Sequence, residues 1–396
     1  MSGPANSPLS SRLLTVLYLG FVLTGIVTTL LGPLIPLFVK RCAMSDAAAG
    51  FLVGAQFAGH LVGALFANRN LRRSVIAGMP LICLGVCALA FSSCTLAYLC
   101  TACYGVGLGL TISAINLIIA RRQSDRRAYS LTLLNFLWGV GAVGSPILVE
   151  WARRQQHLTA SLLGVGVVCL GLWLALVKSY LSILPEQETQ PVAGSWYSPA
   201  LLFFGAMFFL YVGLETAVGA WTALYAMRMP RVNDSIAAFA VAGFWLALLS
   251  GRLIYSAILR YVPEQPIYRL SLAFTLAGLS LFLFSMSSEA VVLAASVTGF
   301  GLAPLFPLIL SFAADSLLAS RNSGWVFSSA GLGGAVVPWL VGQISTQFGS
   351  LRVGFVLPAS VAVLIVALSL SRLGPGPQSG MRSRFFPVDS ARTRVQ

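Results

Sequence analysis

The run WGVGAVGSP, residues 138–146, returns 192 positions later as AGLGGAVVP, residues 330–338. The run YGVGLGL, residues 104–110, returns 194 positions later as TGFGLAP, residues 298–304. Each pair keeps two glycines at the same spacing, and the first pair also keeps its proline. Recurrence at a nearly constant long interval indicates two copies of the same structural unit within a chain. The sequence is therefore predicted to fold as two related halves.

The composition around these repeats is that of membrane-spanning helices. Of the 396 residues, 57% are hydrophobic and only 9% are charged, and the mean hydropathy is +0.86. A soluble domain carries about a quarter charged residues, whereas a transmembrane helix needs about 20 mostly apolar residues. Twelve spans are predicted: 13–38, 47–67, 74–93, 95–120, 129–151 and 158–177, then 200–227, 235–259, 267–287, 289–318, 324–347 and 351–372.

The expected architecture is an all-α membrane protein with twelve transmembrane helices in two pseudo-symmetric six-helix bundles. Residues 1–12 are expected to form a cytoplasmic N-terminus, 13–177 the first bundle and 200–372 the second. The polar, proline-rich stretch 178–199 is expected to be a cytoplasmic linker, and 373–396 a disordered basic cytoplasmic tail. Parallel halves of six spans are typical of secondary transporters that hold their solute between the halves.

The basic residues follow the predicted membrane topology. If both termini are cytoplasmic, 18 of the 25 lysines and arginines fall on the cytoplasmic side and seven on the other. This asymmetry is the positive-inside rule, so the net charge of +14 needs no nucleic-acid partner. We expect a multi-pass protein whose partner is the lipid bilayer. The scarcity of lysine beside arginine favours a GC-rich genome, and so a bacterial inner membrane.

Nothing in the sequence suggests catalysis. The two histidines, His60 and His157, lack the spacing of a metal site, and no nucleophile and base or phosphate-binding loop is recognisable. The seven cysteines also lack metal-ligand spacing and are interpreted as small packing residues. The chain is therefore predicted not to be an enzyme and to need no cofactor or metal.

Glu215 is the ionisable residue nearest the middle of a predicted span. A charge at the bilayer centre costs about 3 kcal/mol, so such a group normally faces the bundle interior or a water-filled cavity. Its counterpart in the first half, 193 positions earlier, is Val22, so the carboxylate is not a feature of the repeated framework. We predict that Glu215 binds the substrate or a coupling ion. The alternative is a buried structural carboxylate bonded to a neighbouring hydroxyl or amide.

Other polar and aromatic side chains are predicted to join Glu215. Amides both donate and accept hydrogen bonds, which suits a polyhydroxylated ligand, and indole rings offer flat apolar faces to sugar rings. The predicted substrate-binding residues are Glu215, Gln56, Asn135, Trp221, Trp138 and Asn116. Each tryptophan taken alone is more often a packing residue or an interface anchor.

A cytoplasmic gate is predicted from a second set of polar residues. Arg252 and Asp315 fall toward the cytoplasmic ends of their spans, where opposite charges can form a latch between moving elements. Gly59-His60-Leu61 aligns with Gly251-Arg252-Leu253, so His60 occupies the corresponding position in the first half. A proton-relay role for His60 is the alternative.

Several of these segments resemble the major facilitator superfamily and, within it, the fucose permease-like sugar transporters. YVGLETAVGAW at 211–221 and GLGLTISAIN at 107–116 are similar to helix 7 and helix 4 motifs of that group. GRL at 251–253 and GLAPLFP at 301–307 also fit. The resemblance covers roughly residues 13–372 and implies the superfamily fold and transport of a sugar or sugar-like solute by alternating access.

The chain departs from the proton-coupled members of that group. The positions that align with their acids in helices 1 and 4 are near Pro33 and at Ile112. Coupling through those positions is therefore not expected. Glu215 remains as a coupling residue for a proton or a sodium ion, and facilitated diffusion without an ion is the alternative.

The sequence is compatible with two further functions. The run Gly139-x-Gly-x-x-Gly-x-Pro146 in the span 129–151 loosely resembles the glycine-proline motif of drug antiporters, but a structural role in a gating helix is favoured. Because apolar and aromatic residues are abundant and polar ones scarce, a proton-driven exporter of amphipathic drugs or lipids is the main alternative. A non-transporting receptor on the same fold is disfavoured, because the predicted loops are short. One chain contains the whole pathway, and we expect a monomer.

Overall fold

The structure is a computed structural model that describes residues 11–67, 69–122, 127–180, 199–229, 234–259, 261–318 and 323–372. Within these ranges the chain is helical apart from short turns, which confirms the predicted all-α fold. The helices of the first half are α1 (Ser11–Thr29), α2 (Leu31–Cys42), α3 (Asp46–Ala67), α4 (Leu71–Phe91), α5 (Leu96–Arg122), α6 (Arg127–Arg154) and α7 (Leu158–Tyr180).

The second half begins with α8 (Pro199–Met227). It continues with α9 (Asp234–Ile258), α10 (Glu264–Phe284), α11 (Ser288–Leu302), α12 (Leu305–Leu318), α13 (Ser323–Phe348), α14 (Leu351–Gly354) and α15 (Val356–Arg372). Most of the expected linker and all of the expected basic tail lie outside the described residues.

The fifteen helices of the described residues make twelve membrane spans, because in three cases two consecutive helices together form a single span. Eleven segments of the described chain are long and apolar enough to cross a membrane, among them α1 with α2, α11 with α12, and α14 with α15. The 26-residue α13 occupies the remaining place. Proline explains the first break. Pro33 has no N–H to donate to the carbonyl of Thr29, and the helix is interrupted at Leu30 between them.

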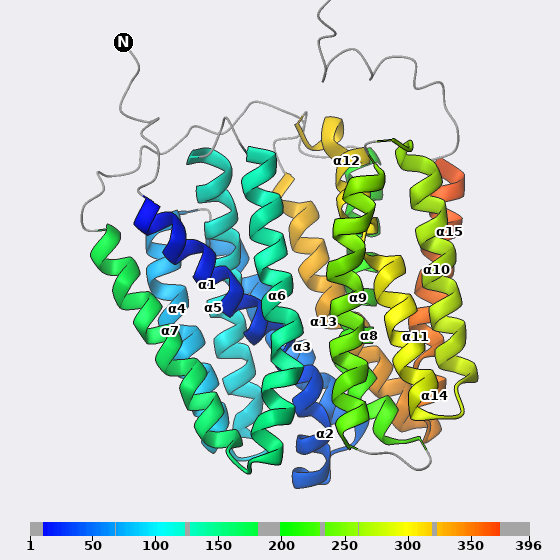
Figure 1. The fold of residues 1–396 in the computed structure, drawn as a ribbon, viewed down its shortest axis with the longest axis horizontal. Coiled ribbons are helices and arrows are strands. Elements are labelled where there is room, and N and C mark those ends of the chain that lie inside the picture. Colours follow the sequence, from blue (N-terminus) through cyan, green and yellow to red (C-terminus); the bar gives the residue numbers. More distant parts are fainter. Residues whose placement is uncertain are drawn as a thin grey trace, which may run out of the picture.

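The spans gather into two bundles, one from each half of the sequence (Figure 1). In the first, α5 packs against α3 and α4, α1 against α6, and α4 against α7. In the second, α11 packs against α9 and α10, and α8 against α13. The bundles meet where α3 packs against α13, α6 against α9 and α2 against α8.

Equivalent glycines of the repeat make equivalent helix contacts in the two bundles. A Cβ built on Gly141 would lie 2.0 Å from the carbonyl oxygen of Val22, and one built on Gly333 would lie 2.0 Å from that of Phe209. Both contacts join helices of one bundle, so these glycines let backbones approach closely. Gly139 and Gly331, two residues earlier, instead face Leu249 and Leu61 of the opposite bundle. Part of the repeat therefore builds each bundle, and part faces the other bundle.

The two ends of the molecule differ. The first residues of α1 and the last of α15 lie at one end, called here the terminal end, whereas α14 and the end of α2 lie at the other, called the α14 end (Figure 1). At the α14 end, Cys42 and Cys94 form a disulfide with Cα atoms 5.9 Å apart. The interpretation of all seven cysteines as packing residues is therefore wrong for these two. Cys42 is the last residue of α2 and Cys94 follows α4, and helix packing brings together these two positions, which are 52 residues apart.

Candidate functional site

Glu215 of α8 and Arg252 of α9 are oppositely charged residues near each other on the second bundle. The electrostatic attraction of Arg252 acts on the Glu215 carboxylate, and the Tyr211 hydroxyl lies beside both. That hydroxyl also donates to the carbonyl oxygen of Leu302 at 3.2 Å. A phenol has one proton, so it can serve only one acceptor at a time. The Tyr211 hydroxyl can therefore donate to Leu302 or to Glu215, but not to both at once.

Helix geometry directs this group toward the first bundle. Glu215 lies four residues before Gly219 on α8, and residues four apart share a helix face. A Cβ built on Gly219 would lie 2.8 Å from the Trp245 ring of α9, so this face of α8 points toward Trp245, whose ring meets Trp138 of the first bundle. Leu249, three residues before Arg252 on α9, likewise meets Gly139 of α6. Glu215 and Arg252 therefore lie beside the α9 residues, Trp245 and Leu249, that contact the first bundle.

Two donors near the surface where the bundles meet have no acceptor. Within the described residues, Nε of Arg252 and Nε1 of Trp245 are buried without a hydrogen-bond partner. Indole and guanidinium nitrogens donate and cannot accept, so they favour ligands rich in acceptor oxygens. Buried polar groups are normally satisfied. These unsatisfied donors, together with the Glu215 acceptor, suit the hydroxyl groups of a small polar solute.

The predicted tryptophans take different positions. The ring of Trp138 on α6 meets that of Trp245 on α9 edge to face, with centroids 5.6 Å apart, so Trp138 lies at the meeting of the two bundles. Trp221 is fully buried, and its Nε1 donates to the carbonyl oxygen of Pro338 at 2.9 Å. That bond joins α8 to α13 within the second bundle. In this conformation Trp221 acts as a packing residue and Trp138 faces the opposite bundle.

The predicted amides bond within the first bundle. Gln56 is 1% exposed, its Nε2 donates to the carbonyl oxygen of Thr28 at 2.9 Å, and its Oε1 accepts from Tyr104 at 2.9 Å. Asn116 and Asn135 each donate at 2.9 Å to the carbonyl four residues earlier in their own helices. Asn135 is exposed, three residues before Trp138 on α6. Of these amides, Asn135 is the one that presents its side chain outside the packed bundle.

Of the predicted cytoplasmic gate, the structure describes the side chains of Arg252 and His60. Arg252 acts on Glu215, as described above. Asp315 belongs to α12, but its side chain lies outside the described residues. The His60 ring is stacked on that of Phe57, with centroids 6.1 Å apart, on α3. The described residues contain no group of three or more histidine, cysteine or acidic side chains suited to a metal ion.

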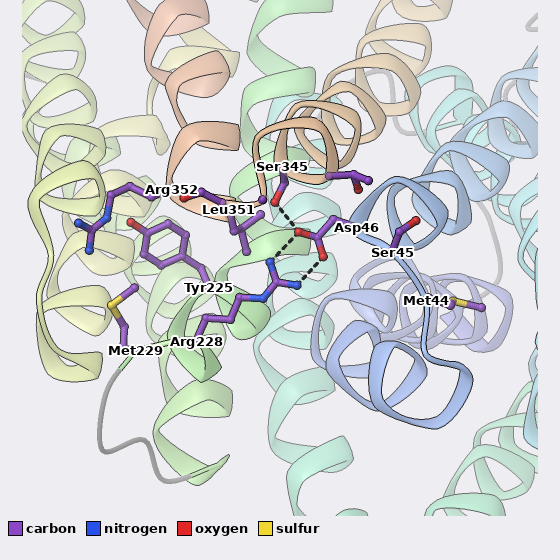
Figure 2. A pocket seen from close by; sticks show the side chains of 12 residues that line it. Met44, Ser45, Asp46, Tyr225, Arg228, Met229, Ser345, Leu351 and Arg352 are labelled. Carbon is purple, nitrogen blue, oxygen red and sulfur yellow. Dashed lines mark hydrogen bonds and ion pairs between the residues drawn. The ribbon is translucent and has the colours of Figure 1, made fainter.

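Sequence reasoning missed a polar contact at the α14 end. Asp46, the first residue of α3, is 6% exposed and accepts from Nη1 and Nη2 of Arg228 at 2.6 and 2.5 Å. Ser345 of α13 also donates to this carboxylate. Figure 2 shows the three side chains converging from the two bundles. An acidic residue at a helix start is typical of capping, so the sequence alone gave no reason to pair it with a residue 182 positions away.

These residues border an open pocket of about 510 Å³ at the junction of the bundles. The pocket wall is mostly from the second bundle, with Tyr225, Arg228 and Arg352 on one side and Met44 and Asp46 on the other (Figure 2). Arg352 donates to the carbonyl oxygen of Ser285 at 2.6 Å, which holds the start of α14 against the end of α10. The ion pair thus stands at the edge of solvent rather than in the bundle interior.

Comparison with known proteins agrees with this architecture. "Membrane protein MosC" of Rhizobium meliloti is 23% identical, over 94% of this chain and 93% of the relative. A "Glucose/galactose transporter" of Brucella abortus biovar 1 is 26% identical, over 90% of this chain and 95% of the relative. Crystal structures of the fucose permease FucP match with TM-scores of 0.65 and 0.64 at 18% and 17% identity. Both cover 91% of this chain and 98% of the other, and one is described as the E. coli fucose:proton symporter.

A family model covers most of both bundles. It is the model of the Major Facilitator Superfamily, and it matches residues 17–329. The match spans the repeated glycine runs of the first half and their first repeat in the second. With two six-span bundles that meet along one surface, the chain belongs to the major facilitator superfamily.

Proposed function

We propose that the protein carries a sugar or sugar-like solute across the membrane by alternating access. The observation that carries the proposal is the group formed by Glu215, Arg252 and Tyr211 beside the surface where the bundles meet. A carboxylate, a guanidinium and a phenol supply both acceptors and donors to a polyhydroxylated ligand. The names of the relatives, which include glucose/galactose transporters, support the same solute class.

The solute site is proposed to combine charged and flat apolar groups. Glu215 accepts from solute hydroxyls, while the free donors of Arg252 and Trp245 bind solute oxygens. Trp138 and Trp245 offer ring faces and edges to the apolar side of the sugar. Asn135 adds an exposed amide from the first bundle. Gln56, Asn116 and Trp221 would join only after giving up the bonds they make within their bundles.

Glu215 is also the proposed coupling residue. It is a partly buried acid with Arg252 nearby, so gain or loss of a proton changes the net charge of the proposed solute site. Proton symport fits this arrangement, and the FucP relative is described as a fucose:proton symporter. Sodium coupling and uncoupled movement remain the alternatives to be tested on the same residue.

The terminal end is proposed to be cytoplasmic, in a bacterial inner membrane. The asymmetry of basic residues supports this orientation. The disulfide between Cys42 and Cys94 gives a second, independent argument, because it lies at the α14 end. Disulfides persist in oxidising compartments such as the bacterial periplasm and are rare in the cytosol. The α14 end would therefore face outward, and one chain would act as a monomer.

Counterflow in proteoliposomes tests the proposal. Vesicles loaded with an unlabelled hexose are expected to accumulate labelled tracer transiently, and Glu215→Ala is expected to abolish this accumulation. Glu215→Gln keeps the shape but removes the charge. Under proton coupling it should retain counterflow and lose accumulation driven by a proton gradient.

Glu150→Gln is the matched control, because Glu150 pairs with Arg153 and Arg154 inside α6, away from the proposed site. Wild-type uptake by folded Glu215→Ala would remove Glu215 from the mechanism. Absence of counterflow with hexoses, pentoses and small oligosaccharides would overturn the sugar assignment.

The exporter of drugs or lipids is not favoured. The glycine-proline run that suggested it is a packing feature, since Gly141 allows α6 to contact the backbone of α1. The glucose/galactose relative matches nearly its whole length. Inhibition of hexose counterflow by lipophilic cations would be the result that reopens this alternative.

A further inference from the structure

We propose that Asp46, Arg228 and Ser345 form a latch that closes the α14 end, and that the Cys42–Cys94 disulfide positions Asp46 for it. The latch rests on alternating access but not on the identity of the solute. Asp46 belongs to the first half of the chain, whereas Arg228 and Ser345 belong to the second. Separation of the bundles at this end must therefore break every one of these bonds.

The ion pair has the geometry of a specific contact. Both terminal nitrogens of Arg228 donate to the two oxygens of Asp46, which is the bidentate arrangement that gives guanidinium–carboxylate pairs their strength and direction. Ser345 donates to one of the same oxygens. The carboxylate is 6% exposed, so these donors replace water when the end is closed. In an open end, water would take their place.

The backbone around Asp46 strengthens the closure. The N–H of Ala47 donates to Oγ1 of Thr346 at 2.7 Å, which is a further bond between the halves. A Cβ on Gly342 would lie 2.4 Å from the carbonyl oxygen of Asp46, so α13 approaches the first turn of α3 as closely as backbones allow. The start of α3 and the end of α13 therefore fit together in one closed arrangement.

The disulfide fixes the turn that carries Asp46. Cys42 ends α2, and Ala43 adopts a left-handed backbone conformation with φ of 47°. The disulfide ties this turn to Cys94, and Nη2 of Arg41 donates to the carbonyl oxygen of Ser92 at 3.3 Å. On the other side of Asp46, Tyr98 donates to the carbonyl oxygen of Ala48 at 3.1 Å. These three ties make Asp46 move with the α4–α5 connection.

Arg228 and Asp46 are buried to different extents, so the latch predicts different effects for substitutions of the two residues. The Arg228 side chain is 39% exposed and the Asp46 side chain 6%. Arg228→Gln would leave a buried carboxylate without its cation, whereas Asp46→Asn would leave an arginine that water can still reach. Removing the partner of a buried charge is the more disruptive change. Arg228→Gln is therefore expected to favour the open end more than Asp46→Asn.

A cysteine reporter reads the state of the α14 end. Ala220 on α8 is 7% exposed and lies against Gly32 of α2, so a cysteine there is shielded while the bundles touch. The alkylation rate of Ala220→Cys by a membrane-impermeant maleimide is measured at peptide level. Right-side-out and inside-out vesicles are compared, and the peptide readout separates the reporter from the native cysteines.

The latch predicts a rate increase from one side of the membrane only. In the reporter background, Asp46→Asn should raise the rate by about fivefold or more, and Arg228→Gln by a larger factor. The charge exchange Asp46→Arg with Arg228→Asp should lower the rate again. Glu150→Gln, which breaks an ion pair inside one helix, should leave it unchanged. Ser345→Ala is the milder variant should Arg228→Gln fail to fold.

Rates for the Asp46 and Arg228 variants equal to that of Glu150→Gln, in protein with native gel-filtration behaviour, would overturn the latch. The disulfide part is tested by Cys42→Ser with Cys94→Ser, which should also raise the rate. An unchanged rate there would overturn the positioning role alone. The reporter needs no solute, so a failed sugar assignment with altered alkylation is distinguishable from a failed latch.

Discussion

Arg252 and Glu215 show how far a single charged residue can be interpreted from sequence. Glu215 was identifiable because an acid in the middle of an apolar span is costly wherever its neighbours lie. Its neighbours were not identifiable. The sequence predicts a gate between Arg252 and Asp315 from their depth along the helices, and sequence position does not give the direction of a side chain. The structure places Arg252 beside Glu215 through the packing of α8 against α9.

The interaction between Glu215 and Arg252 is expected to contribute to the free energy of unfolding of the protein. Arg252→Gln and Glu215→Gln each leave one charge without its counter-ion, whereas the double variant leaves neither. Thermal unfolding in detergent of the four proteins should give a coupling free energy of about 1 kcal/mol or more. Glu215→Gln combined with Arg269→Gln, an exposed arginine on α10, is the control and should be additive. Additivity in the first cycle as well would show that the charges do not stabilise each other.

Asp46 was missed for the opposite reason. Its position at the start of α3 has an ordinary explanation in helix capping, and its partners come from 182 and 299 residues away. Which helix ends meet is a property of the assembled bundles. A sequence with two copies of one unit predicts that the copies face each other, but not which side chains meet across the junction.

At the scale of the helices, the sequence predicts that the repeated glycines lie at helix contacts. It does not predict which of them contact a helix of the same bundle and which face the other bundle. The sequence indicates small residues at helix contacts in both halves. The packed structure is needed to tell the two apart. A Cβ built on Gly331 would lie 3.8 Å from the Leu61 side chain, whereas one built on Gly333 would lie 2.0 Å from the carbonyl oxygen of Phe209. The breaks within the first and tenth spans were also not predicted, since proline is tolerated in membrane helices whose neighbours satisfy the freed backbone groups.

This difference between two glycines of one helix gives a direct test. Gly333→Ala forces α13 away from α8 and is expected to destabilise the protein by about 1–3 kcal/mol. Gly331→Ala meets only ordinary contacts and should stay within about 0.5 kcal/mol of the native protein. Thermal unfolding in one detergent compares the two variants. Equal losses would mean that α8 and α13 are less closely packed than the structure shows.

For the whole molecule, twelve spans in two halves were predictable because hydropathy and internal repetition are properties of the sequence itself. The sequence does not predict which end of the molecule is closed. The latch at the α14 end, together with the contact between Gly32 and Gly219, describes bundles held together at that end. No sequence pattern reports which of two alternating arrangements a chain adopts, because both must be compatible with the same residues.

Closure of the α14 end therefore depends on the absence of side chains where α2 meets α8. A Cβ on Gly32 would lie 2.6 Å from the carbonyl oxygen of Gly219, and this backbone cannot yield without moving one bundle. Gly32→Ala is expected to hold the α14 end open. The counterflow rate should fall by about tenfold or more, because an increase of about 1.4 kcal/mol in the barrier to closure lowers the rate by about tenfold. Solute should still bind from the open side.

Gly54→Ala is the matched control in the same surface between the bundles. Its Cβ would lie 3.7 Å from the carbonyl oxygen of Ala335, which is an ordinary contact, so counterflow should be retained. Spin labels placed at the α14 ends of the two bundles would report a longer distance for Gly32→Ala than for Gly54→Ala. Native counterflow in Gly32→Ala would show that α2 and α8 need not approach this closely during transport, and that closure depends on the side chains around Asp46 instead.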